Sequence, residues 1–556
     1  MAFEMRREDY IALYGPTQGD RIRLGDTNLI AYIEKDYAEY GNEVVGGAGK
    51  TLRDGMMTAN LVSKELELTA VLQGAVIIDP ILGVIKADIG IRDGYIVAIG
   101  RAGNPDIQDH VDLVIGPNTL VLPGQGMIAT PGGLDIHVHF GTPQIMWEAL
   151  SSGLTTLIGA SGIETKHEST LHRMHESFSN IPLNVGFLGK GSSSRPEPII
   201  QSIEWGACAL KMHEDLGVYP EVIDCCLTVA DQMDVQAVIH TDGINESCHV
   251  EETIDAFRGR TIHAYHIEGC GGGHPDVITM VGASNVLPSS TTPTNPYTIS
   301  TTLEHFDMIM TVHRGSHLLP EDVAFARSRI REKTVAAEDV LHDMGAISMM
   351  GSDSNGMGRI GEVICRTWQI AHKMKRHLGS SGNHDNDRIL RYIAKYTINP
   401  AITHGIADYV GSLEVGKLAD IVLWRPGFFG AKPEMIIKGG WPAWGPVGNG
   451  NASIGTSEPL IYRPRFGGFG DATSSLCLSF VSAASLENGI EKRLRTRRKL
   501  VPVRKTRNLR KGHMVRNDLC PPIKIDPKSG DVTLNGEVIT CEPVDWVPLN
   551  QLYFLG

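Results

Sequence analysis

The chain has 556 residues, of which 42% are hydrophobic and 21% charged, as is typical of a soluble globular protein with more than one structural unit. Its 51 Lys and Arg against 64 Asp and Glu give a net charge of −13, which argues against nucleic acid as the main partner. No uncharged apolar run is long enough to span a bilayer, and the N-terminus has no apolar signal core. Nine scattered cysteines without a C-x-x-C pattern indicate reduced thiols, so we expect a cytoplasmic protein without a membrane partner.

The N-terminal part of the chain is rich in glycine and β-forming residues. Residues 70–100 alternate short Val/Ile runs with Asp-Pro and Arg-Asp-Gly punctuation, which predicts short antiparallel strands joined by turns. A similar pattern returns at 411–440. We therefore predict one β-rich domain built from two stretches, residues 1–130 and 411–480.

The middle of the chain, residues 131–410, contains eight short and continuous apolar runs, most of them separated by segments long enough for a helix. Such runs suit a parallel sheet that is covered on both faces, and eight of them predict an α/β fold with a TIM-like (β/α)8 barrel. Catalytic residues of this fold lie at the C-terminal ends of the strands. The runs are Gly133–His139, Thr155–Gly159, Leu183–Leu188, Cys208–Met212, Gln236–His240, Thr261–His266, Asn285–Pro288 and Ala346–Met350.

The C-terminal extension, residues 481–556, includes one basic segment. Residues 492–511 carry eleven Lys and Arg, a pattern that also occurs in nucleic-acid or anionic-surface patches. No aromatic residues alternate with the basic ones, and the rest of the chain is acidic. We therefore interpret the segment as a solvated surface helix and loop, or as a subunit contact.

Metal-binding residue types gather at the predicted strand ends. His137 and His139 are two residues apart on a strand, so both imidazoles point to the same side and can face one ion. His240, His266 and Asp353 follow three further strands. Imidazole and carboxylate ligands together suit zinc, nickel, iron or manganese, and the missing cysteines argue against a closed structural zinc site.

Lys211 stands at the end of a buried strand, where an ammonium ion is costly. One interpretation is a carbamate, formed from the lysine amine and CO2, whose two oxygens bridge two metal ions. The alternatives are a Schiff-base lysine, which prefers a pocket without metals, and a lysine that extends to solvent. The nearby ligand candidates favour the carbamate.

Long motifs give the chain a family resemblance. They begin with "YGPTQGDRIRLGDT" and include "LKMHED", "RTIHAYHIEGCGGGH", "LPSSTTPTNPYT", "SDSNGMGR" and "GSLEVGKLADIVLW". With these motifs the chain resembles, nearly end to end, the α (catalytic) subunit of urease within the metal-dependent amidohydrolase superfamily.

The resemblance implies two Ni2+ ions per subunit, bridged by a CO2-derived carbamate on Lys211. One ion would be held by Lys211, His240 and His266. The other would be held by Lys211, His137, His139 and Asp353.

The resemblance also assigns catalytic and substrate-binding roles. His213 would donate a hydrogen bond to the substrate carbonyl oxygen, and His313, on a mobile flap, would be the general acid. Asp215 and Arg329 would support His313. The backbone at Gly356 and Met357 would line the substrate pocket.

The implied activity is that of a hydrolase acting on non-peptide C–N bonds of linear amides. Urea would be cleaved to ammonia and carbamate, which yields CO2, by attack of hydroxide generated at the metals. The implied partners are urease-like β and γ subunits, assembled as a trimer of heterotrimers, and nickel-loading accessory proteins.

Three departures from the family pattern surround the substrate. The flap, where ureases usually carry Cys-His-His, has Val312 and Arg314 on either side of the retained histidine. The loop at 159–178 is shorter than in ureases and brings charges such as Glu164, and Gly356 replaces the usual alanine. An alternative is therefore the same metal chemistry on a larger or charged substituted urea, amide or guanidine compound. A non-catalytic homologue is disfavoured, because every implied metal ligand and the acid are present.

Overall fold

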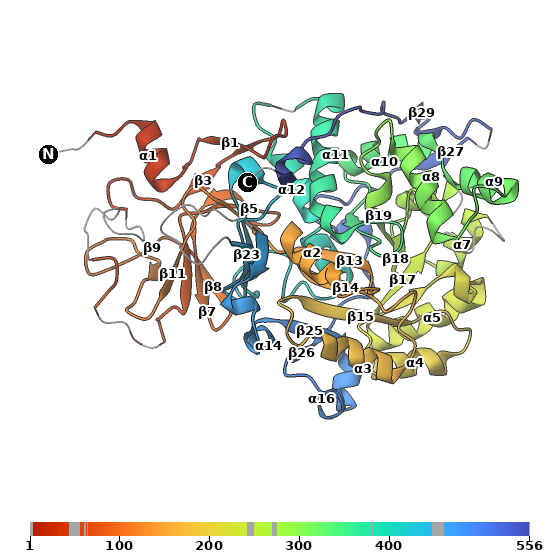
Figure 1. The fold of residues 1–556 in the computed structure, drawn as a ribbon, viewed down its shortest axis with the longest axis horizontal. Helices are drawn as coiled ribbons and strands as arrows, with labels where there is room; N and C mark the ends of the chain where they lie inside the picture. Colours follow the sequence, from red (N-terminus) through yellow and green to blue (C-terminus); the bar gives the residue numbers. More distant parts are fainter. Residues whose placement is uncertain are drawn as a thin grey trace.

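A computed structural model describes residues 4–43, 56–60, 63, 65–241, 249–269, 275–380, 382–447, 461–526 and 528–554 (Figure 1). Part of one quoted motif, residues 270–274, lies outside this range. Among the described helices, none combines the length and the apolar character needed to cross a membrane.

Eight parallel strands in chain order form the predicted barrel, and the fold class is confirmed. Each strand is hydrogen-bonded to the next, and almost every residue in them is buried, as expected for strands enclosed between a packed interior and outer helices. The strands are β13 (Gly133–His139), β14 (Leu154–Ala160), β15 (Asn184–Lys190), β16 (Ala209–Met212), β17 (Gln236–His240), β18 (Ile262–Tyr265), β19 (Val286–Thr291) and β20 (Met349–Gly351).

The barrel is nearly closed between its first and last strands. Asp353 N donates to His137 O at 2.9 Å, and Ser354 forms an isolated parallel bridge with Val138. These contacts lie just past the end of β20, so the closure brings the segment that follows β20 beside the end of β13.

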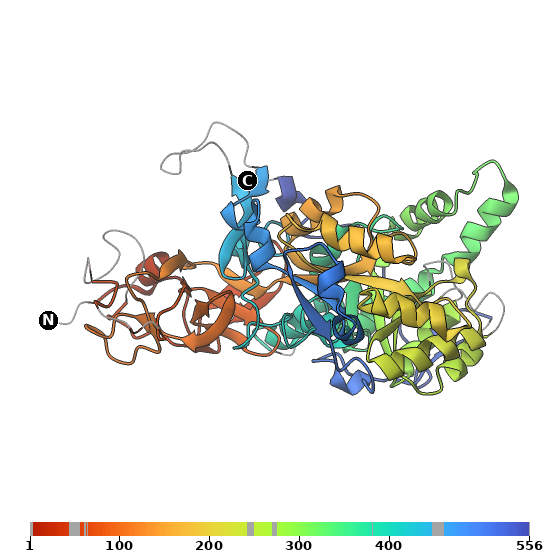
Figure 2. The same cartoon turned by 90° about the horizontal axis from the view of Figure 1, so that it is seen from below.

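Helices cover the outside of the barrel between the strands. Those that precede β18 are α2 (Gln144–Ser152), α3 (Glu168–Ser177), α4 (Pro196–Glu204), α5 (Pro220–Met233) and α7 (Val250–Phe257). Three helices separate β19 from β20, namely α8 (Thr301–Val312), α9 (Pro320–Arg329) and α10 (Glu332–Met344). Helix α11 (Val363–Leu378) follows β20. Helices α8 and α9, green in Figure 2, form a hairpin that projects from the barrel.

The β-rich part combines strands from before and after the barrel. In its larger sheet, β12 (Ile128–Pro131) pairs in parallel with β5 (Val76–Asp79) and antiparallel with β21 (Ile421–Trp424). The sheet continues from β21 through β22 (Met435–Lys438) to β23 (Trp441–Val447). The N-terminal and post-barrel stretches therefore build one β-rich unit beside the barrel (Figure 1).

A buried ion pair ties this unit to the barrel. Lys438 and Asp420 contact each other with side chains that are 0% and 4% exposed. Asn184, at the start of β15, donates to Asp420 Oδ2 at 2.7 Å. Lys438 also donates to Thr155 O at 3.3 Å. These contacts fix the β-rich unit against the N-terminal ends of two barrel strands.

We expect Lys438→Met to lower the free energy of unfolding by about 3–5 kcal/mol, because it leaves the Asp420 charge buried without its partner. Arg425→Met is the matched control, since Arg425 pairs with Glu434 while 63% exposed and should contribute less than about 1 kcal/mol. Guanidinium denaturation, followed by fluorescence, measures both. Equal losses in the two variants would contradict the assignment.

The C-terminal extension adds strands to the barrel sheet. β25 (Leu478–Ser482) pairs in parallel with β15, and β26 (Lys499–Val503) pairs with β25. The interpretation of 492–511 as a surface helix and loop is wrong at β26. This stretch is a strand, because it pairs in parallel with β25.

Many basic side chains of 492–511 have partners within the chain. Arg498 and Lys511 are buried and donate to backbone carbonyls, Arg498 to Leu183 O at 2.6 Å and Lys511 to Val281 O at 2.5 Å. Arg507 pairs with Asp231 at 2.6 Å. The segment therefore acts as a strap across the barrel.

Candidate metal centre and active site

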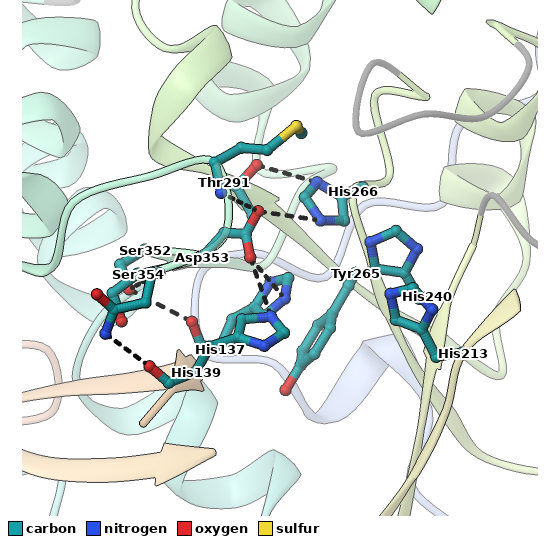
Figure 3. Close-up of polar contacts among 12 residues, drawn as sticks. His137, His139, His213, His240, Tyr265, His266, Thr291, Ser352, Asp353 and Ser354 are labelled. Atoms are coloured by element: carbon teal, nitrogen blue, oxygen red, sulfur yellow. Dashed lines mark hydrogen bonds and ion pairs between the residues drawn. The ribbon is translucent and has the colours of Figure 1, made fainter. Parts of the chain in front are cut away.

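The six predicted metal ligands come together at the C-terminal mouth of the barrel, and Figure 3 shows five of them, all except Lys211. His137 and His139 end β13, and Lys211 and His240 lie at the ends of β16 and β17. Of the other two, His266 directly follows β18, and Asp353 is the second residue after β20. Parallel strands end on the same rim, which is why residues far apart in the chain converge here.

Asp353 lies at the centre of this cluster. Its carboxylate oxygens are 3.4 Å from His137 Nε2, 3.2 Å from His139 Nε2 and 3.6 Å from His266 Nε2. Burial opposes ionisation, but the hydrogen bond with His139 and the nearby imidazoles hold the pKa of Asp353 well below its usual range. The site therefore contains an ionised carboxylate that faces three imidazole nitrogens.

Two of the imidazoles, those of His137 and His240, are held in the neutral form that binds metals. Burial lowers the pKa of His137 and of His240 far below the ordinary value, and neighbouring cationic groups add to the shift. His137 is 1% exposed, and its Nδ1 has no hydrogen-bond partner among the described residues. Neutral, buried ring nitrogens are suited to ligate a cation.

Backbone and hydroxyl groups orient two of these rings. His139 Nδ1 lies 2.8 Å from Gly162 O, and His266 Nδ1 lies 3.2 Å from Thr291 Oγ1. These contacts turn the Nε2 atom of each ring toward Asp353. Outer contacts of this kind fix the tautomer and the direction of a metal-binding histidine.

Two of the candidate ligands have left-handed backbone. His266 has φ +47° and Asp353 has φ +56°. Such conformations are unfavourable for residues other than glycine and concentrate at functional sites. Here the strained backbone directs both side chains into the mouth.

Lys211 is buried among these groups. Its Nζ lies 3.4 Å from His139 Nε2, and the residue is 1% exposed. Burial lowers the pKa of Lys211 to about 8, although Asp353, Glu214 and Glu164 act in the opposite direction. The amine is therefore deprotonated more easily than a surface lysine, and it does not extend to solvent.

His263, three residues before His266, lies apart from the cluster. Its ring bridges His404 Nε2 at 3.2 Å and Ser289 Oγ at 3.0 Å. These contacts give His263 a structural role in the barrel interior.

The predicted acid His313 and its partner Arg329 belong to the projecting hairpin, and Asp215 belongs to the turn Glu214–Leu216 that follows β16. His313 caps the C-terminus of α8, and its Nδ1 lies 3.0 Å from Ile309 O. Arg329 is buried at the end of α9, with its guanidinium 4.5 Å from the Phe325 ring centroid. Burial and Glu214 raise the pKa of Asp215, while nearby His313 lowers it. Asp215 and His313 are therefore close enough for the charge of one to act on the other.

Gly356 and Met357 contact Asp353 rather than opening extra space. Met357 N donates to Asp353 Oδ2 at 3.1 Å. A Cβ atom at Gly356 would lie 2.5 Å from Asp353 Oδ1. A side chain at position 356 would therefore compete with the Asp353 carboxylate for space.

We expect Gly356→Ala to weaken metal binding by about 10-fold or more, because the new methyl group displaces the Asp353 carboxylate. Gly361→Ala is the matched control, since no atom lies within 4 Å of a Cβ built there. Titration of the metal-free protein with Ni2+ measures both affinities. Unchanged affinity in Gly356→Ala would contradict this, because it would show that the Asp353 carboxylate can move away from the methyl group and still bind the metal.

The acidic side chain of the short loop after β14 is anchored by backbone hydrogen bonds. Glu164 is 3% exposed and accepts hydrogen bonds from Ser192 N at 2.9 Å and Gly191 N at 3.3 Å. His167 caps helix α3 by accepting from Ser169 N. Glu164 thus links this loop to the loop after β15, and His167 fixes the start of α3.

Sequence reasoning did not assign two residues of the mouth. Glu214 Oε2 lies 2.9 Å from His240 Nδ1 and 3.1 Å from His213 Nδ1. Tyr265 stacks on His137 with ring centroids 3.7 Å apart. The His-Glu-Asp run was a signal for Glu214, but Tyr265 precedes its strand-end histidine and looks like an ordinary core residue.

A barrel with imidazoles, a lysine and a carboxylate at its strand ends has the architecture of a metal-dependent hydrolase. The model of the amidohydrolase family matches residues 128–443, more than half of the chain, and the chain belongs to this family. The model of the urease α-subunit N-terminal domain matches residues 3–122. The protein is thus a hydrolase of non-peptide C–N bonds.

Solved structures with a similar fold include two hydantoinases. A D-hydantoinase (dihydropyrimidinase) from Thermus sp. has 16% identity and a TM-score of 0.48, with 67% of this chain and 95% of that chain covered. An L-hydantoinase from Arthrobacter aurescens has 13% identity and a TM-score of 0.49, with 75% and 100% covered.

The family binds a divalent metal, and the residues present fit one. Two groups, His137–His139–Asp353 and His213–Glu214–His240, each place three ligand atoms within 4.8 Å of one another. The neutral buried imidazoles and the ionised Asp353 supply both the electron pairs and the charge that a divalent ion needs.

Proposed function

We propose that the protein is the catalytic subunit of a urease-like enzyme that hydrolyses urea to ammonia and carbamate. The observation that carries the proposal is the coincidence of two features in one chain. The urease α-type N-terminal match at 3–122 precedes a barrel of the amidohydrolase family, and that barrel places Lys211 beside His139 at its mouth.

The proposed centre contains two Ni2+ ions. One would be held by Lys211, His240 and His266, and the other by Lys211, His137, His139 and Asp353. When bound, the metals would supply Lewis-acid polarisation of the carbonyl and a water of lowered pKa.

Lys211 would bridge the ions after reaction with CO2. Its amine nitrogen forms a bond to the carbon of CO2 and loses one proton, which leaves a carbamate with two oxygens and one negative charge. Burial supports this product, because the carbamate removes the ammonium ion and places its negative charge among cations. The 3.4 Å contact with His139 puts the nitrogen within reach of the ligand cluster.

His213 is suited to hold the substrate carbonyl oxygen. Its Nδ1 accepts a hydrogen bond from Asp215 N at 3.3 Å, which assigns the proton to Nε2 in a neutral ring. Burial and the charge of His240 lower the pKa of His213 to about 2, so the ring remains a neutral donor. A donor held in this way stabilises negative charge that develops on the oxygen.

His313 is suited to protonate the leaving nitrogen, so that ammonia departs rather than an amide anion. It is exposed on the projecting hairpin, and closure of that hairpin would carry it to the mouth. Asp215 and Arg329 would orient the imidazole as it approaches.

Urea is favoured over a larger or charged substrate by two contacts at the departures from the family pattern. The space beside Gly356 is taken by Asp353, and Glu164 is tied to the loop after β15. Gly356 therefore adds no room in this arrangement. The Glu164 carboxylate acts on Lys211 from its anchored position, but it is only 3% exposed and so is not open to pair with a substrate cation. The flap residues Val312 and Arg314 remain the difference that a substrate comparison must test.

The proposal includes the assembly that the resemblance implies. Urease-like β and γ subunits would join this chain in a trimer of heterotrimers in the cytoplasm, and accessory proteins would load nickel. The first experiment is to co-express these components, supply Ni2+ and bicarbonate, and measure ammonia release from urea. Two nickel ions per chain and steady ammonia release are expected, whereas a folded assembly without bound metal would support a non-catalytic homologue.

A further inference from the structure

His213, Glu214 and His240 form a second group of ligand atoms at the barrel mouth. Glu214 Oε2 lies 3.1 Å from His213 Nδ1 and 2.9 Å from His240 Nδ1. The two rings are stacked with centroids 4.3 Å apart and planes 25° apart, so both present the same edge to the carboxylate. The set is therefore compact without any rearrangement.

The contacts within this group are not ordinary hydrogen bonds. Glu214 Oε2 is buried and accepts no hydrogen bond from the described residues, although two ring nitrogens lie within 3.1 Å. His213 Nδ1 accepts from Asp215 N at 3.3 Å, so in a neutral ring this atom carries no proton for the carboxylate, and a bound cation would take the place of that long contact. Electron-pair donors that face one another in a buried site favour a cation between them.

The exposed fractions of the side chains show which ligand candidates lie nearer to solvent and which lie deeper in the mouth. Glu214 is 24% exposed, His240 is 8% exposed and His266 is 0% exposed. A cation that enters from solvent therefore meets Glu214 first, His240 next and His266 last. His240 belongs both to this outer group and to the ligands proposed for the inner ion.

We propose that His213, Glu214 and His240 form a loading site, which holds an incoming divalent cation before Lys211 carries its carbamate. While Lys211 is an amine, the inner position lacks its bridging anion, and Glu214 supplies the negative charge instead. Once the carbamate has formed, His240 shares the ion with Lys211 and His266, and His213 is released to bind substrate. This sequence rests on the proposed nickel centre, but binding at the outer group does not require urea hydrolysis.

The test is Ni2+ titration of the metal-free full chain in CO2-free buffer, by calorimetry and by metal analysis after desalting. The native chain is expected to bind one ion at the outer group and one at His137–His139–Asp353. Glu214→Gln should lose the outer ion, with affinity reduced about 10-fold or more. Glu214→Asp, which keeps the charge but shortens the reach, should weaken the same step.

Two controls separate this site from a general charge effect and from the inner site. Asp215→Asn removes one charge from the adjacent residue and should retain both ions. His266→Ala should also retain the outer ion in CO2-free buffer, because His266 is not one of its ligands.

Unchanged stoichiometry and affinity in both Glu214 variants would overturn the proposal, as would loss of the outer ion in His266→Ala. A protein that binds the outer ion through Glu214 but releases no ammonia from urea would overturn the proposed function alone. With bicarbonate present, Glu214→Gln should reach two ions per chain several times more slowly than the native chain. Equal loading rates would also count against a loading site.

Discussion

Lys211→Ala should abolish urea hydrolysis and leave fewer than two metal ions per chain. The substitution removes the proposed bridging carbamate, so the two ions lose a shared ligand and the negative charge that holds them together. We expect activity below about 10⁻³ of the native value, comparable to loss of an essential catalytic group. Metal analysis and ammonia release, measured on the same preparation, check both parts.

Lys190→Ala is the matched control for this prediction. Lys190 pairs in register with Lys211 on the neighbouring strand, but its side chain is 29% exposed and faces Glu164 at 3.9 Å. Its removal should leave metal content and turnover close to native. Formate or acetate should partly restore metal binding to Lys211→Ala, because a small carboxylate can bridge two cations. Two tightly bound ions in Lys211→Ala without any additive would show that the carbamate role is wrong.

His313→Ala should lower kcat by about 10²–10⁴-fold, the usual contribution of a general acid, while two metal ions remain bound. The reason for the separation is structural. His313 lies on the α8–α9 hairpin, where its ring packs against Phe325 at 5.1 Å, and the candidate ligands lie on barrel strands. Steady-state kinetics with metal analysis distinguish loss of the acid from loss of the centre.

His317→Ala is the control on the same hairpin. The ring centroids of His317 and Phe306 are 5.9 Å apart. We expect His317→Ala to change kcat by less than a few-fold. A large loss of kcat in His317→Ala and none in His313→Ala would show that His317, rather than His313, is the general acid. A loss of metal in His313→Ala would mean that the hairpin supports the centre rather than supplying a proton.

The fold could be predicted from the pattern of apolar runs, but several boundaries could not. All eight barrel strands were predicted, because continuous apolar runs between helix-length segments are typical of parallel strands buried on both faces. The seventh and eighth strands differ most, since β19 extends to Thr291 and β20 begins only at Met349. Their ends are set by pairing of Ser289–Thr291 with Met349–Gly351, and polar residues such as Ser289 gave no apolar signal there.

The candidate site was predictable where strand-end position determines it. His137, His240 and Asp353 could be placed at one rim because parallel strands of a barrel end together. Their metal-binding roles stay predictions. Glu214 and Tyr265 could not be assigned from the sequence. The role of Glu214 depends on its distance to the His240 ring, and that of Tyr265 on its stacking against His137, and both contacts join different strand ends.

The basic segment 492–511 shows the limit of local composition. Its charges predicted a solvated surface, yet Arg498 and Lys511 are buried and bind backbone carbonyls of distant elements. Those carbonyls, Leu183 O and Val281 O, are separated from the segment by hundreds of residues in the chain. No local pattern contains that information.

The most direct test of the central claim compares substrates for one nickel-loaded assembly. Ammonia release is measured from urea and from a panel of N-substituted ureas, linear amides and guanidines, with equal enzyme and matched concentrations. The proposed function predicts that urea has the highest kcat/KM and that Arg314→Ala leaves this preference unchanged. Hydrolysis of a panel member with none of urea would contradict it.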